Sequence, residues 1–104
     1  MSARLPIDLV GLKALCARWN IRRLDLFGSV LRDDFGPDSD VDVLVTFAPD
    51  THYGFFALFD LEQELEGLLR RKVDLVTRPA IERSRNPIRR DAILSSAETV
   101  YVAP

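Results

Sequence analysis

The stretch GSVLRDDFGPDSDVDVLV, from Gly28 to Val45, decides the fold because it joins a small-residue turn to a strand that carries acidic residues. The apolar run 24–27 before it predicts a strand, and Ser29 is a good N-cap for a short helix beginning at Val30. A Gly-Ser turn that opens a helix exposes backbone N–H groups, and Gly28 has no Cβ to keep a phosphate away. This half of the stretch therefore predicts a phosphate-binding turn.

The second half of the stretch carries two carboxylates at the start of a predicted strand over 41–47. Alternation along a strand places Asp40 and Asp42 on one face, about 6.6 Å apart at a rise of about 3.3 Å per residue. Side chains at that spacing can converge on one divalent cation, or on two cations about 3.5–4 Å apart. A phosphate-binding turn next to oxygen ligands is the combination that phosphoryl or nucleotidyl transfer requires.

A third carboxylate lies in a later strand, predicted over 72–77. Val73 and Leu75 are expected on one face of this strand and Asp74 on the other. An unpaired carboxylate is costly in a buried strand with a purely structural role. We therefore expect Asp74 to lie beside Asp40 and Asp42.

The spacing of these residues is similar to a known signature. Gly-Ser followed, after ten residues, by Asp-x-Asp resembles the signature of the DNA polymerase β-type nucleotidyltransferase superfamily. The fuller strings Gly28-Ser29-x-x-Arg32 and Ser39-Asp40-x-Asp42 resemble its minimal nucleotidyltransferase (MNT) branch. The likeness covers nearly the whole chain, since Asp74 matches the place of the third carboxylate in that family.

Two positions depart from the pattern of this family. Leu31 stands where the family commonly has alanine, and Asp33 stands where it commonly has glycine. Asp33 adds a negative charge near the turn that would bind phosphate, so it bears on turnover rather than on the metal ligands.

The resemblance implies a role for each residue of the site. Asp40, Asp42 and Asp74 would be the catalytic and metal-binding residues, with Asp40 and Asp42 holding two Mg²⁺ ions. Asp74 would complete the shell of the second ion and accept a proton from the attacking hydroxyl. ATP would be the substrate, and the residues expected to bind it are Gly28, Ser29, Arg32 and Ser39.

The resemblance also implies a partner and a reaction. In the MNT branch the protein is usually the antitoxin of a HEPN-domain toxin, an RNase-like helical protein. The implied reaction is transfer of AMP from ATP to a hydroxyl of the toxin, with tyrosine as the expected acceptor. An antitoxin that neutralises the toxin by binding alone is the alternative. A stand-alone enzyme acting on small molecules is a third hypothesis, which the length of the chain disfavours.

Composition limits the other functions of the chain. The 104 residues predict one domain, 1–104, and the 47% apolar and 29% charged residues are typical of a soluble globule. No apolar run approaches the ~20 residues of a membrane span, and a net charge of −2 argues against direct nucleic-acid binding. The single cysteine, Cys16, excludes an internal disulfide and fits a cytoplasmic protein. Its helical spacing with Leu12 and Leu15 predicts that it is buried.

Apolar periodicity predicts the remaining elements. The expected helices start at Pro6-Ile7-Asp8 and end near Trp19, cover 55–70, and run from Asn86-Pro87 to Ala97; the expected strands cover 23–27, 41–47, 72–77 and 99–102. Ile88, Ile93 and Leu94 are expected to point inward from the last helix. The predicted fold class is α/β (α+β): a small, mixed, twisted sheet with helices mainly on one face, resembling the palm of polymerase β.

One aromatic residue does not fit the core of this fold. Phe56 falls on the polar side of the helix predicted over 55–70, and Phe59 lies at its edge. Either another segment covers these rings, or they contact a partner such as the toxin or a second copy of this chain. The sequence leaves both readings open.

Overall fold

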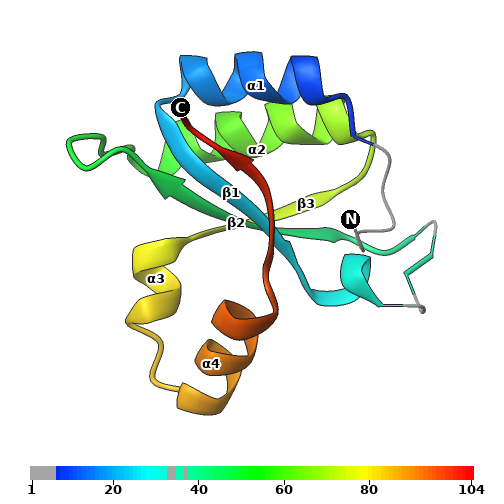
Figure 1. The fold of residues 1–104 in the computed structure, drawn as a ribbon, viewed down its shortest axis with the longest axis vertical. Coiled ribbons are helices and arrows are strands. Elements are labelled where there is room, and N and C mark those ends of the chain that lie inside the picture. The colour runs from blue at the N-terminus through cyan, green and yellow to red at the C-terminus, as the bar shows by residue number, and fades with distance from the viewer. Residues whose placement is uncertain (1–6, 33–34, 37) are drawn as a thin grey trace.

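The structure is a computed structural model, and it describes residues 7–32, 35–36 and 38–104. Four strands, four α-helices and one 3₁₀ helix follow one another in this part of the chain (Figure 1). Their order is α1 (Leu9–Arg18), β1 (Ile21–Phe27), the 3₁₀ helix η1 (Gly28–Leu31), β2 (Val41–Phe47), α2 (Phe55–Leu69), β3 (Val73–Thr77), α3 (Arg78–Glu82), α4 (Pro87–Ser96) and β4 (Glu98–Val102).

The four strands form one mixed sheet in the order β3-β2-β1-β4. β1 runs antiparallel to both β2 and β4, whereas β2 and β3 are parallel. Parallel neighbours need a crossover connection, and α2 supplies it between β2 and β3. The mixed sheet predicted from the sequence is confirmed.

Helices pack on both faces of the sheet through two apolar clusters. The larger cluster joins α1 and α2 to the sheet, and Val43 and Val45 of β2 belong to it. Leu44 lies between these two valines and therefore points to the opposite face. There it packs with Phe27, Ile81 of α3 and Ile93 of α4 in the smaller cluster. Figure 1 shows α1 and α2 side by side, with α3 and α4 away from them.

Local sequence explains where α1 and α4 begin. The Asp8 carboxylate caps α1 by accepting a hydrogen bond from the Gly11 amide, and the Asn86 side chain caps α4 through the Arg89 amide. Pro6, part of the predicted start of α1, lies outside the described residues. Cys16 is buried, as predicted, and desolvation raises the pKa of its thiol to about 12.

One prediction about local structure is wrong, and one short helix was not predicted. Ser29 is not a helix N-cap, because it lies inside the four-residue 3₁₀ helix η1, which Phe27 precedes. The segment after β3 is a short helix, α3, which is not among the helices expected from the sequence. It forms because the Thr77 hydroxyl caps it and Pro79 is tolerated in its first turn, where no amide partner is needed.

Side-chain exposure corrects one prediction and decides another. Ile93 is buried and Leu94 packs beside it, but Ile88 is 83% exposed, so its predicted inward orientation is wrong. Phe56 is 82% exposed and Phe59 is 53% exposed. Of the two readings left open by the sequence, cover of Phe56 by another segment is therefore excluded for the described residues.

In this part of the chain, no helix is both long and apolar enough to cross a membrane.

Candidate active site

The parallel pairing of β2 with β3 sets two of the predicted carboxylates side by side. Asp42 and Asp74 are register partners across these strands. Both lie on the sheet face that also carries Leu44, because each alternates with residues of the larger apolar cluster. Asp40 comes just before β2, and its carbonyl accepts a hydrogen bond of 3.5 Å from the Ser29 hydroxyl. The site therefore lies where η1, β2 and β3 meet.

The three carboxylates differ in their exposure to solvent. Asp40 and Asp74 are exposed, whereas Asp42 is half-buried. The expectation that Asp74 stands in a buried position, and is costly there, is therefore wrong. The β2–β3 register, rather than the cost of burial, is what connects Asp74 to the site.

The environment of this site shifts the pKa of Asp42. Burial is the largest cause that raises the pKa of its carboxyl, and the charges of Asp74 and Asp40 raise it further. The positive charges of Arg32 and Arg89 oppose this rise. A cation bound among these oxygens would relieve the same repulsion.

The donor set fits Mg²⁺ in its chemistry, because carboxylate oxygens are the ligands that this ion prefers. The side chains are not gathered around one point, however. Among residues 7–32, 35–36 and 38–104, no group of three or more His, Cys, Asp or Glu side chains is close enough to hold a metal ion. The assignment of Asp40, Asp42 and Asp74 as metal ligands thus stays a prediction.

Gly28 is required by the geometry next to Asp42. Its φ is +76°, in the left-handed region that residues with a side chain rarely adopt. A Cβ at this position would lie 2.2 Å from Oδ2 of Asp42, which is far inside contact distance. From the sequence, we expected the missing Cβ of Gly28 to leave space for a phosphate. The structure shows that the Asp42 carboxylate itself already needs it.

The other predicted nucleotide-binding residues lie around the same corner. Ser29 is half-buried in η1, and Arg32 is exposed at the end of that helix, where its amide bonds to the Ser29 carbonyl at 2.9 Å. The Ser39 hydroxyl accepts a hydrogen bond of 3.1 Å from the Gly36 amide, so it supports the loop before β2. Contact of these residues with a nucleotide stays a prediction. Asp33 lies outside the described residues, and its effect is likewise untested.

An arginine from the α2–β3 connection holds that loop. The Arg71 guanidinium donates to the carbonyls of Gly36 and Ser39, the latter at 2.9 Å, and it lies 4.3 Å from the ring centre of Phe35. A cavity of about 460 Å³ opens beside Asp40, lined by Asp38, Ser39, Asp40, Arg70, Arg71 and Lys72. There is thus room for a ligand next to Asp40.

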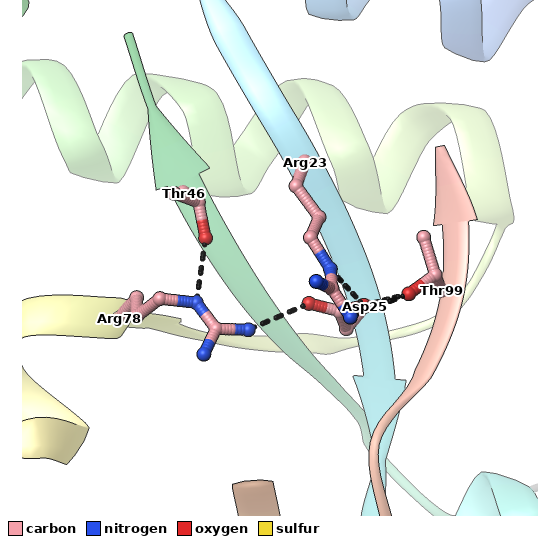
Figure 2. A network of polar contacts seen from close by, with 5 residues as sticks. All are labelled: Arg23, Asp25, Thr46, Arg78 and Thr99. Carbon is pink, nitrogen blue, oxygen red and sulfur yellow. Dashed lines mark hydrogen bonds and ion pairs between the residues drawn. The ribbon is translucent and has the colours of Figure 1, made fainter. Parts of the chain in front are cut away.

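The sequence analysis missed a buried carboxylate on the same face of the sheet. Asp25 of β1 is fully buried, and it accepts hydrogen bonds from Arg23 at 3.0 Å, Thr99 at 2.6 Å and Arg78 at 3.2 Å (Figure 2). Arg78 also donates to the Thr46 hydroxyl at 2.9 Å. This network links β1, β2 and β4 to the first residue of α3. An acidic residue between Leu24 and Leu26 was the available signal.

Comparison with known proteins places the chain in a family. The model of the nucleotidyltransferase domain matches residues 11–98. The protein adenylyltransferase MntA of Thermococcus cleftensis is 37% identical over 70 residues, which are 67% of this chain and 69% of that protein.

Solved structures share the fold. A toxin–antitoxin complex with AMP-PNP contains a chain that matches with a TM-score of 0.69 and 18% identity, over 93% of this chain and 75% of that one. A tri-AMPylated Shewanella oneidensis HEPN toxin in complex with MNT antitoxin gives 0.61 and 21%, over 91% and 70%. A candidate minimal nucleotidyltransferase gives 0.59 and 37%, over 88% and 94%. The chain therefore belongs to the nucleotidyltransferase domain family.

Proposed function

We propose that this protein is a Mg²⁺-dependent protein adenylyltransferase that acts as an antitoxin. It would transfer AMP from ATP to a hydroxyl, expected to be that of a tyrosine, on a HEPN-domain toxin. The single observation that carries the proposal is the pairing of Asp42 with Asp74, with Asp40 close enough for its charge to act on Asp42. A free, buried Cys16 is compatible with work in the cytoplasm.

The residues of the chain would divide the reaction between them. Bound Mg²⁺, held by Asp40, Asp42 and Asp74, would supply positive charge to the triphosphate and to the attacking oxygen. Asp74 would accept the proton of the acceptor hydroxyl, whose oxygen bonds to the α-phosphorus of ATP. The bond from that phosphorus to the bridging oxygen breaks, and pyrophosphate leaves. The Gly28 and Ser29 amides, with Arg32 and Ser39, would orient the departing phosphates.

The comparisons support this reaction and this partner. The T. cleftensis relative is named a protein adenylyltransferase. One structure of the same fold contains AMP-PNP, and another contains an MNT antitoxin with an AMPylated HEPN toxin. These properties belong to the other proteins, and they support the same nucleotide, reaction and partner for this chain.

A second function is favoured by a specific observation. Because the described carboxylates are not gathered into a metal-binding group, the protein could neutralise its toxin by binding alone. The two functions make opposite predictions about covalent chemistry, because binding alone leaves the mass of the toxin unchanged.

Labelled ATP tests the proposal. The toxin, found as the product of a neighbouring reading frame for a small helical protein, is incubated with this protein, Mg²⁺ and ATP labelled on either the α- or the γ-phosphate. We expect label from the α-phosphate on the toxin and none from the γ-phosphate. Asp42→Asn should abolish the transfer, whereas Asp50→Asn, an exposed carboxylate in the loop after β2, should retain it. A stable complex that never acquires label would establish the binding-only function instead.

A further inference from the structure

Helix α4 lies over the sheet face that carries the candidate active site. Ile93 of α4 is buried with Phe27 and Leu44 in the smaller apolar cluster. Leu44 follows Asp42 by two residues on β2, so both side chains point to the same face. Phe27 is the residue of β1 paired with Asp42. The packing of Ile93 therefore fixes α4 next to the carboxylates.

Arg89 lies on the same side of α4 as Ile93. The two residues are four apart, and residues at that spacing share one face of a helix. Arg89 is exposed, and its charge is close enough to act on Asp42. Its charge thus acts on the site from an element that the sequence motif does not include.

Several arginines of the described residues are paired with groups of the protein, and Arg89 is not one of them. Arg23 and Arg78 bind Asp25, and Arg90 pairs with Asp91 at 3.2 Å. Within the described residues the Arg89 side chain forms no ion pair shorter than 4 Å and no hydrogen bond. Its planar fork of N–H donors matches a phosphate group and is available for one.

We propose that Arg89 binds the phosphate groups of the nucleotide at the candidate active site. This inference rests on the proposed function, and it adds α4 to the elements that bind substrate. The alternative role for Arg89 is that of a distant positive charge that only offsets the carboxylates. A distant charge can be replaced by lysine without loss, whereas a two-pronged phosphate contact cannot.

Titration with AMP-PNP in the presence of Mg²⁺ tests the inference on wild type, Arg89→Ala, Arg89→Lys and Arg90→Ala. Arg90→Ala is the matched control, because it removes the same charge from the next position of α4. We expect Arg89→Ala to weaken binding about ten- to hundredfold, as for loss of charge-assisted hydrogen bonds. Arg89→Lys should recover only part of this loss, and Arg90→Ala should bind within about twofold of wild type. Binding of adenosine, which has no phosphate, should be equal in all four proteins.

The outcomes separate this inference from the proposed function. If wild type binds AMP-PNP and Arg89→Ala or Arg89→Lys binds it equally tightly, Arg89 is no phosphate ligand, while the proposed function stands. If Arg89→Ala weakens adenosine and AMP-PNP to the same degree, the phosphate contact is also excluded. If folded wild type binds no AMP-PNP at all, both the inference and the proposed function fail.

Discussion

At the scale of single residues, the surroundings of Asp42 disfavour the ionised form of its carboxyl. Burial, Asp74 and Asp40 all raise the pKa of its carboxyl above the ordinary value of 3.8. The folded protein therefore binds this proton more tightly than the unfolded chain. Between the ordinary and the raised pKa, ionisation of Asp42 lowers the free energy of unfolding as pH rises. This loss of unfolding free energy is complete above the raised pKa, and it is absent at pH values well below 3.8.

Asp42→Asn removes that cost, so without Mg²⁺ we expect it to raise the melting temperature at pH 7. The gain should shrink as pH falls through the raised pKa towards 3.8. Melting curves of wild type, Asp42→Asn and the exposed control Asp38→Asn from pH 7 to about 4 measure this effect. A lower melting temperature for Asp42→Asn at pH 7 would contradict the electrostatic description. Addition of Mg²⁺ should stabilise wild type more than Asp42→Asn, if Asp42 is a ligand.

Gly28→Ala should destabilise the protein and disturb the site together. The left-handed backbone costs a residue with a side chain roughly 1–2 kcal/mol, and the new Cβ would displace the Asp42 carboxylate. Urea unfolding should show this loss, and AMP-PNP titration should show weaker binding than for Ser29→Ala. Gly67→Ala is the control of opposite sign: it lies inside α2 with open space around it, so we expect a gain of about 1 kcal/mol. Equal stability of Gly28→Ala and wild type would refute the close approach.

At the scale of elements, periodicity predicted the sheet and the longer helices because the alternation of apolar residues reports directly which side faces the core. The β2 bounds 41–47 were predicted without error, and β3 differs by one residue. The helix α3 was missed because Arg78-Pro79 is also typical of a strand end. Arg89 was missed because its position depends on how α4 packs through Ile93, which no local pattern reports.

Arg71 is predicted to keep the loop before β2 in place. Arg71→Met removes the donors to the Gly36 and Ser39 carbonyls but keeps most of the apolar stem. We expect faster hydrogen exchange at the Ser39 amide, which bonds to the Gly36 carbonyl at 3.1 Å. Arg70→Met is the control, since Arg70 is the exposed neighbour. An unchanged exchange rate in Arg71→Met would show that the loop before β2 does not need Arg71 to stay in place.

At the scale of the whole molecule, the described sheet is enclosed by helices, yet one aromatic surface is left uncovered on α2. Phe55 and Phe56 are each about four-fifths exposed, and their rings meet edge to face at 5.7 Å. Burying one phenylalanine is worth roughly 1.5–3 kcal/mol, and aromatic residues are enriched at interface centres. We therefore predict that Phe56 contacts the toxin or a second copy of this chain.

Phe56→Ser separates an interface role from a structural one. The melting temperature of the isolated chain should stay almost unchanged, because exposed substitutions usually alter stability by less than about 0.5 kcal/mol. Complex formation, followed by sedimentation with and without the toxin, should weaken. Leu65→Ser, in the buried face of the same helix, should instead lower the melting temperature by several degrees. Loss of stability in Phe56→Ser comparable to that of Leu65→Ser would exclude the interface role.

The central claim is that this protein transfers AMP covalently to the toxin and needs Asp42 to do so. The measurement that tests this most directly is the intact mass of the toxin after co-expression with this protein, compared with co-expression with Asp42→Asn. We predict that the toxin gains the mass of one or more AMP groups with wild type and none with Asp42→Asn, although both proteins form the complex. An unmodified toxin in the wild-type complex, or the same added mass with Asp42→Asn, would contradict the account.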